Sequence, residues 1–92
     1  MKSIHDLIVD ELFVNKSIAA FIYLINIGRE VEINYNNTFA LISKDGSAKQ
    51  CSVWIDENEQ AFECIEKLLE NALIQNQKLV DVWKQIEFKT LF

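Results

Sequence analysis

Nucleophilic chemistry in this chain would depend on one histidine and two cysteines. A Cys–His pair is the nucleophilic arrangement that this composition allows, and catalysis needs both groups within about 3 Å of each other. His5 lies near the start of the sequence, where we expect it on the surface. Cys51 occupies an inward position of an expected strand and Cys64 lies beside core residues of an expected helix, so both thiols should react slowly. The sequence therefore predicts a protein that is not an enzyme.

The remaining motifs indicate no cofactor and no metal. Cys51 and Cys64 are too far apart for a CxxC redox pair and too few for a zinc site, which favours buried thiols in a reducing cytosol. A phosphate-binding loop needs several glycines within a few residues, whereas Gly28 and Gly46 are 18 positions apart. Arg29, the only arginine, could bind an acidic group, but pairing with a neighbouring glutamate is the simpler expectation.

Carboxylates are densest between residues 56 and 70, where we expect a helix to begin. The run lacks the glycine and the alternating oxygen ligands of a calcium-binding loop. Side chains three and four positions apart share one face of a helix. We therefore predict an acidic ridge that docks a basic protein partner and consists of Glu59, Glu63, Glu66 and Glu70. The alternative is a solvated helix face without a partner.

The most apolar stretch, residues 17–27, is a candidate for self-association. Its length falls short of the roughly 20 residues that span a membrane, so we interpret it as a buried helix. A small sheet covers only one side of such a helix, and a second copy of the chain could cover the other. Within residues 12–25, the expected self-association residues are Ile18, Phe21, Ile22 and Ile25. Alternatively, the preceding helix and the C-terminal tail cover this helix within the monomer.

Composition and charge favour one domain, residues 1–92, with a basic partner. Half of the 92 residues are hydrophobic, which is enough for a core without disulfides or a metal. A net charge of −5 repels nucleic-acid phosphates and anionic lipids, so neither nucleic acid nor a membrane is an expected partner. The first residues lack the pattern of a signal peptide, and we expect a cytoplasmic protein.

Capping residues place the first helices. Ser3 can cap a helix over residues 4–13, and the polar run Asn15-Lys16-Ser17 can cap a second helix over residues 18–27. Gly28 would end the second helix by adopting a left-handed conformation. Because no strong helix breaker lies between the two, a single long helix is an alternative.

After Gly28 the hydrophobic period changes from helical to alternating, which indicates strands. Three runs alternate in this way, with an Asn36-Asn37 turn and an Asp45-Gly46 turn between them, and they predict a three-stranded antiparallel meander. Helical spacing returns from residue 56 to residue 72. A polar break is expected at residues 75–77, and a short last helix is expected over residues 79–86. Residues 88–92 could add an edge strand. The predicted fold class is α+β.

Two segments resemble those of a loose group of small proteins of Gram-positive bacteria and their phages. Residues 24–36 are similar to a "GREIEFxYNG" hairpin pattern, and residues 68–83 are similar to a C-terminal "LLENAxIxGKxLxxIW" pattern. The resemblance covers about residues 24–87. The chain departs from it at Asn37, where the group usually has glycine, and at Gln77, where glycine or a nearby polar residue is common. The resemblance implies the fold and a bacterial or phage origin, and it supplies no functional residues.

The function that these features favour is binding of another protein, as in immunity proteins and phage-encoded inhibitors of similar size and charge. One alternative is a structural homodimer whose partner is itself. Another is a small-molecule-binding or enzyme-accessory module with a pocket between the sheet and the apolar helix.

Overall fold

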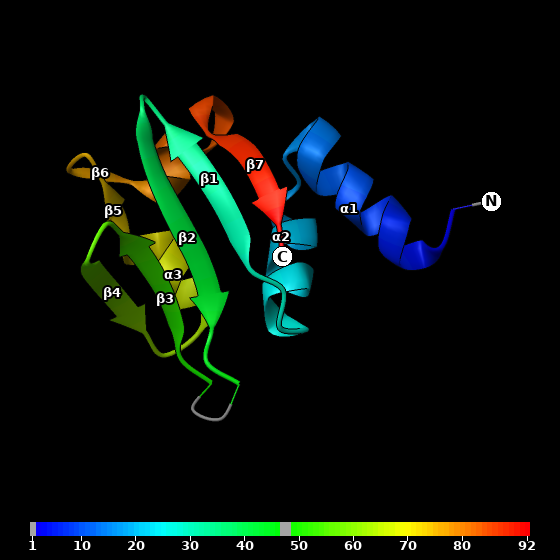
Figure 1. Cartoon of the computed structure of the whole chain (residues 1–92), viewed down its shortest axis with the longest axis horizontal. Helices are drawn as coiled ribbons and strands as arrows, with labels where there is room; N and C mark the ends of the chain where they lie inside the picture. Colours follow the sequence, from blue (N-terminus) through cyan, green and yellow to red (C-terminus); the bar gives the residue numbers. More distant parts are fainter. Residues whose placement is uncertain (1, 47–48) are drawn as a thin grey trace.

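The computed structural model describes residues 2–46 and 49–92. Two helices come first, a meander of strands follows, and a helix, a short hairpin, a 3-10 helix and a last strand complete the fold (Figure 1). This order confirms the predicted α+β class. The elements are α1 (Ile4–Asn15), α2 (Ile18–Asn26), β1 (Val31–Tyr35), β2 (Thr38–Lys44), β3 (Cys51–Ile55), β4 (Asn58–Phe62), α3 (Ile65–Asn71), β5 (Leu73–Ile74), β6 (Gln77–Lys78), η1 (Leu79–Gln85) and β7 (Glu87–Leu91).

The N-terminal region forms two helices rather than one. The Ser3 Oγ accepts a hydrogen bond from the Asp6 amide, and the Ser17 Oγ accepts one from the Ala20 amide, each at 3.1 Å. Between the helices Lys16 has a φ of 54°, a left-handed value that breaks the helical path. Gly28, with a φ of 95°, follows the end of α2 as predicted.

The junction at Lys16 is held by η1. The indole Nε1 of Trp83 donates a hydrogen bond to the Lys16 carbonyl at 2.7 Å. In return, the Lys16 Nζ donates to the Lys84 carbonyl at 2.6 Å. The bend between α1 and α2 is therefore fixed by groups that lie more than sixty residues further along the chain.

The sheet is larger than the sequence predicts. β1 to β4 form an antiparallel meander, and β7 pairs with the other side of β1, so the strand order is β4-β3-β2-β1-β7. The predicted three strands are its centre, and the possible edge strand at residues 88–92 is β7. Asn36 and Asn37 join β1 to β2 with φ angles of 49° and 67°, as a type I′ turn requires. The turn expected after Asp45 is present at Gly46.

The prediction that a helix starts near residue 56 is wrong, because α3 begins at Ile65. Asp56 has a left-handed φ of 54° and opens a tight turn that reverses the chain after β3. The next five residues become β4, whose backbone groups pair with those of β3. Apart from Phe62, which packs against the core from β4, the expected apolar stripe lies on or just after α3.

The last third of the chain matches the predicted break and short helix, with two refinements. The polar break is a hairpin turn between β5 and β6, in which Gln75 and Asn76 have φ angles of 52° and 63°. The short last helix, η1, has 3-10 geometry. The Gln75 side chain donates to the Asn36 carbonyl at 2.9 Å, which ties this turn to the turn between β1 and β2.

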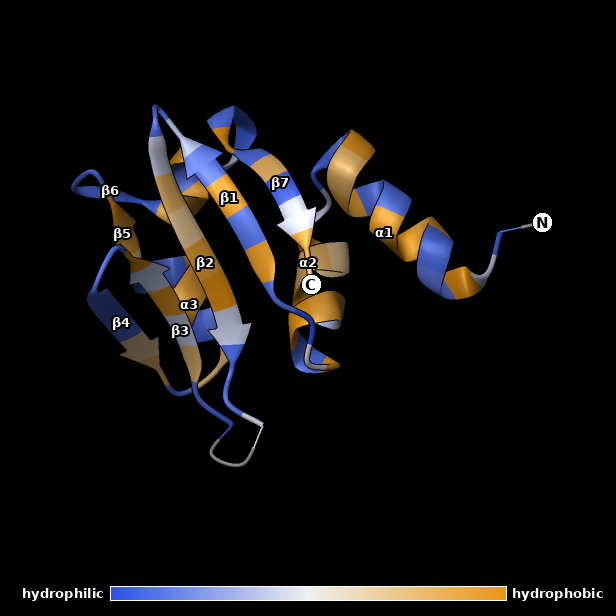
Figure 2. Ribbon diagram, viewed as in Figure 1, coloured by the Kyte–Doolittle hydropathy of each residue, from blue (hydrophilic) through white to orange (hydrophobic). Residues whose placement is uncertain are grey.

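Helices α2, α3 and η1 pack behind the sheet, and the opposite face of the sheet is left open (Figure 1). Apolar and polar residues alternate along β1, whereas α2 is apolar along most of its length (Figure 2). An aromatic cluster joins α2 to the C-terminal region, with ring centroids 5.1 Å apart for Phe21 and Trp83 and 5.2 Å apart for Trp83 and Phe88. The most deeply buried large side chains are Phe21, Leu12, Leu24, Ile25, Ile33, Ile42, Ile65, Leu68, Ile74, Leu79, Ile86 and Val31.

Helix α1 packs along α2 and extends away from the sheet (Figure 1). Its exposed apolar side chains include Ile4, Leu7 and Val14. Within the described residues, no helix has the length and hydropathy needed to cross a bilayer.

Candidate binding surface on the open face of the sheet

His5, Cys51 and Cys64 lie on different elements of the fold: α1, β3 and the residue before α3. The His5 Nε2 lies 2.7 Å from the Arg29 Nη1, on the side of the molecule formed by α1 and α2. Cys51 is buried in β3, and burial raises the pKa of its thiol, so little of it is in the reactive thiolate form. Cys64 is half-buried just before α3.

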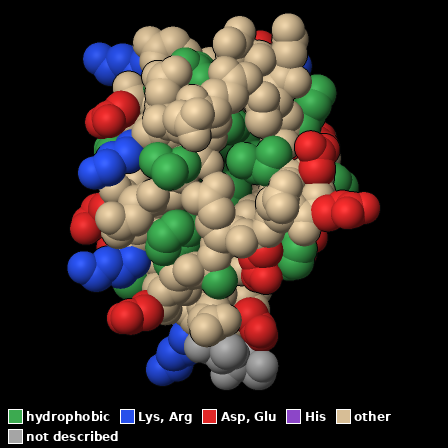
Figure 3. All heavy atoms as spheres, turned by 90° about the vertical axis from the view of Figure 1, so that its left-hand side faces the viewer, with side chains coloured by type: hydrophobic (Ala, Val, Ile, Leu, Met, Phe, Trp, Pro, Cys, Tyr) green, Lys and Arg blue, Asp and Glu red, His purple; other side chains and the backbone are tan. Residues whose placement is uncertain are grey.

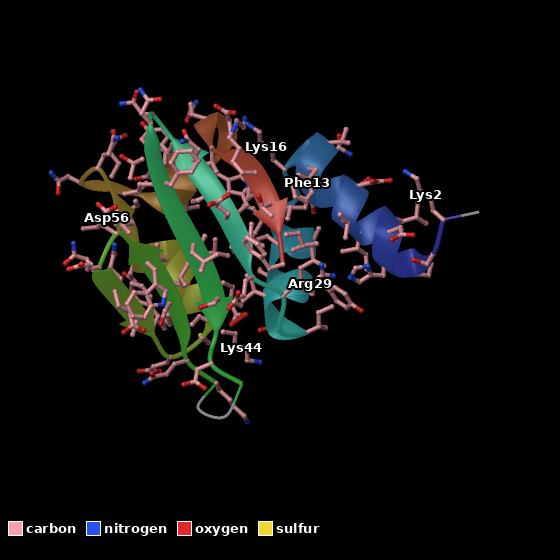
Figure 4. All side chains as sticks on the ribbon, viewed as in Figure 1. Lys2, Phe13, Lys16, Arg29, Lys44 and Asp56 are labelled. Carbon is pink, nitrogen blue, oxygen red and sulfur yellow. The ribbon has the colours of Figure 1, made fainter. Side chains whose placement is uncertain are left out.

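Arg29 does not pair with a neighbouring glutamate, contrary to the simpler expectation. Its Nε donates a hydrogen bond to the Phe92 carbonyl at 2.6 Å, and its guanidinium also contacts His5. The arginine therefore ties the end of α2 to the end of β7 (Figure 4). Among residues 2–46 and 49–92, no group of three or more His, Cys, Asp or Glu side chains is arranged to hold a metal ion.

The four glutamates of the predicted acidic ridge do not share one helical face. Glu59 lies in β4 and Glu63 lies between β4 and α3. Glu66 and Glu70 are exposed on α3, where their spacing of four keeps them on one side. The shared face is absent because it requires a helix that starts before Glu59, and that segment pairs with β3 instead.

The predicted self-association residues are also divided. Phe21 and Ile25 are fully buried within the monomer, so they are not available to a second copy in this structure. Ile18 is exposed and Ile22 is half-buried. The alternative expectation, that the first helix and the C-terminal tail cover this helix, describes the observed packing: α1 lies along α2, and Trp83 and Phe88 contact Phe21.

A row of paired residues crosses the open face of the sheet from edge to edge. Glu32 of β1 pairs with Thr90 of β7 on one side and with Leu41 of β2 on the other. Leu41 pairs with Trp54 of β3, which in turn pairs with Glu59 of β4. Directly paired side chains on one face of a sheet are in contact range. Two apolar side chains are therefore flanked by two carboxylates.

Hydroxyl groups orient both of these carboxylates. The Ser52 Oγ donates to the Glu59 Oε2 at 2.5 Å, and the Thr90 Oγ1 donates to the Glu32 Oε1 at 3.2 Å. Each carboxylate keeps a second oxygen and further lone pairs that can accept hydrogen bonds from a ligand. The two acidic groups are thus held in place before anything binds.

The apolar part of the open face includes two exposed aromatic side chains. Phe39 is 54% exposed and Trp54 is 38% exposed. They border a shallow hollow of about 280 Å³, which is lined by Glu32, Phe39, Ala40, Leu41, Trp54 and Asp56. Asp56 lies at the turn between β3 and β4 (Figure 4). This lining combines aromatic rings with two carboxylates and contains no basic residue.

The charge around the open face is mainly acidic. Figure 3 looks onto the β4 edge, so that the open face forms its right-hand margin. Lysine and acidic side chains alternate along the opposite margin, whereas the right-hand margin shows mainly acidic side chains. On β7, the Lys89 Nζ is paired with the Glu87 Oε2 at 2.9 Å.

Comparison of the chain with protein-family models, with curated proteins and with solved structures finds no match. The candidate surface is therefore identified from the geometry of this molecule alone.

Sequence reasoning missed Phe39, Leu41 and Glu32 as surface residues of one site. The signal was present in the alternation: Trp54 falls between the inward residues Val53 and Ile55, and Glu32 falls between two inward residues of β1. A bulky aromatic residue at an outward strand position indicates either a covering element or a binding surface. Which residues share a row could not be read from the sequence, because strand register sets it.

Proposed function

We propose that this chain is a small, acidic, non-enzymatic protein of bacterial or phage origin that acts by binding another protein through the open face of its sheet. The observation that carries the proposal is the exposed pair of aromatic rings, Phe39 and Trp54, on a sheet face that none of the described helices covers. Tryptophan is enriched among the residues that contribute most to binding at protein interfaces. An apolar centre with a polar rim is the usual anatomy of such an interface.

Charge supports a basic partner. The net charge of −5 attracts a basic protein at long range, and the carboxylates of Glu32, Asp56 and Glu59 concentrate that charge at the apolar patch. Complementary charge accelerates association and disfavours acidic competitors. Inhibitors and immunity proteins work by such occupancy and need no chemistry of their own.

Site-specific crosslinking tests the proposal. A photoreactive phenylalanine analogue replaces Phe39 in one variant and Val80, which is exposed on η1, in a matched variant. The variants are produced in a bacterial host, irradiated, and compared by mass spectrometry. We expect one specific product from position 39 that disappears when Trp54→Ala is added. Identical product patterns from both positions, or a product that is insensitive to Trp54→Ala, would contradict the proposal.

A structural homodimer is the second candidate, and exposed apolar side chains on α1 and α2 favour it. Ile4, Leu7 and Tyr23 are exposed, and an apolar hollow of about 290 Å³ between α1 and α2 is lined partly by Ile8 and Ala19. Light scattering over a range of concentrations distinguishes this candidate. A dimer that Leu7→Lys converts to monomer, while Val80→Lys does not, would support it; a monomer at all concentrations removes it.

A further inference from the structure

The hollow on the open face combines the features that recognise one particular side chain. Trp54 and Phe39 are diagonal neighbours across β3 and β2, because Trp54 pairs with Leu41, two positions from Phe39. Diagonal neighbours lie roughly 7–8 Å apart at Cα, within reach of aromatic side chains. Both rings are exposed, so each presents surface to a ligand in the same hollow.

Carboxylates approach the indole of Trp54 from two directions. Glu59 is its direct partner on β4, where side chains on one face are roughly 5 Å apart at Cβ. Asp56 is two residues further along the chain and lines the hollow from the β3–β4 turn. A third carboxylate, that of Glu32, borders the hollow beyond Leu41.

Among the described residues, no basic side chain forms an ion pair with Glu32, Asp56 or Glu59. The six residues that line the hollow include no Lys or Arg. The single arginine is on another side of the molecule, bound to the Phe92 carbonyl and His5. A cation that occupies the hollow must therefore come from outside this copy of the domain.

We propose that the hollow binds an arginine side chain of the partner protein, with the guanidinium stacked on Trp54 and hydrogen-bonded to Glu59 and Asp56. Arginine fits better than lysine because its guanidinium is planar, is weakly hydrated, stacks on aromatic rings and donates two parallel hydrogen bonds to a carboxylate. Stacking of a cation on an indole strengthens the charge pairing at the same position. The inference rests on the proposed function, and it specifies the chemistry of the partner.

Two tryptophans make this proposal measurable by NMR. The Trp54 indole lies in the hollow, whereas the Trp83 indole is mostly buried and hydrogen-bonded to Lys16. The ¹⁵N-labelled protein is titrated with an acetylated, amidated tetra-arginine peptide and then with the matched tetra-lysine and tetra-glutamate peptides. We expect saturable movement of the Trp54 indole signal with the Trp83 signal fixed. Arginine should bind about two- to fivefold more tightly than lysine, and the glutamate peptide should have no effect.

Charge variants locate the site. Glu59→Gln and Asp56→Asn should each weaken tetra-arginine binding several-fold, whereas the matched Glu66→Gln on α3 should leave it unchanged. In the variant Trp54→Leu the indole signal is lost, so binding is monitored by the NMR signal of the Leu41 backbone amide. In this variant the preference for arginine over lysine should disappear. Equal affinities of the two cationic peptides for the original protein, equal losses from Glu59→Gln and Glu66→Gln, or a Trp54 signal that does not move would each overturn the arginine site.

Failure of this test and failure of the proposed function are distinguishable. A protein crosslinked through position 39 in a Trp54-dependent manner supports binding by the open face whatever the peptides do. If such a partner is found while the peptides show no preference, the surface is an interface without an arginine pocket.

Discussion

The side-chain amide of Gln60 holds the backbone of Leu73 with two hydrogen bonds, 2.7 Å from its Nε2 to the carbonyl and 2.8 Å from the Leu73 amide to its Oε1. Gln60 lies in β4, an edge strand, and Leu73 begins the small β5–β6 hairpin. The Gln60 side-chain amide thus makes the pair of hydrogen bonds that a residue of a neighbouring strand would make with Leu73. It fastens the strand that carries Glu59 to the region behind the sheet.

Replacing this amide by a carboxylate should destabilise the fold. In Gln60→Glu the Leu73 carbonyl loses its donor and faces a second acceptor, which should lower the free energy of unfolding by about 1 kcal/mol. Urea denaturation followed by circular dichroism measures the change. Gln85→Glu, at an exposed position of η1, adds the same charge and should have little effect. Similar losses in the two variants would show that added charge, and not this contact, is responsible.

The two residues of the β1–β2 turn should respond in opposite directions to glycine. Asn37, with a φ of 67°, occupies the second position of a type I′ turn, and Asn37→Gly should stabilise the fold by about 0.5 kcal/mol. Asn36→Gly should destabilise it, because the Asn36 Nδ2 donates to the Gln75 Oε1 at 3.0 Å. Thermal denaturation of both variants measures the difference. Shifts of the melting temperature in the same direction would contradict the role given to Gln75.

Binding of a partner captured through position 39 should depend on salt through two carboxylates. Because Glu32 and Glu59 flank the apolar patch, the double variant Glu32→Gln, Glu59→Gln should weaken binding by about three- to tenfold at low salt and less at high salt. Calorimetry at two ionic strengths measures this. The matched double variant Glu66→Gln, Glu70→Gln on α3 should behave like the original protein. If the α3 pair is the more sensitive one, the acidic contact lies on the helix.

The free energy of unfolding at high pH should depend on the ionisation of the buried Cys51 thiol. Burial raises the pKa of Cys51 in the folded state above its value in the unfolded chain, so the folded state holds the thiol proton more tightly. That stabilisation is present below the ordinary thiol pKa of about 8.5 and is lost as the pH rises through the folded pKa.

Between about pH 7 and pH 10, the original protein should therefore lose more unfolding free energy than Cys51→Val, which has no proton to release at that position. Guanidinium denaturation at each pH gives the comparison. Equal losses would show that other groups account for the pH dependence.

Much of the fold follows from local signals. Ser3 and Ser17 cap their helices, Gly28 follows the end of α2, and the Asn36-Asn37 turn sets the register of the first hairpin. Each is decided by groups within a few residues of one another, which is why the sequence predicts them.

Features that depend on contacts between residues far apart in the sequence could not be predicted in the same way. Residues 58–62 have enough acidic and amide residues to begin a helix, but the left-handed Asp56 and the open side of β3 make a strand of them. Helix α2 is apolar on nearly all sides, and only its packing against Trp83 and Phe88 shows that Phe21 is internal. The open-face row needs five strands in register. Of these, β4 is predicted from the sequence as the start of a helix and β7 only as a possible edge strand.

The position of β7 beside β1 constrains how this molecule is made. The partner of Glu32 is Thr90, 58 residues away, and Phe21 of α2 packs against Trp83 and Phe88. A chain that emerges from the ribosome can form α1, α2 and the first hairpin, but neither β1 nor the apolar helix α2 acquires its last neighbour until residue 91 has left the exit tunnel. The sheet is therefore completed only after β7 has been synthesised and released, and until then a nascent chain exposes the edge of β1 to chaperones or to another copy.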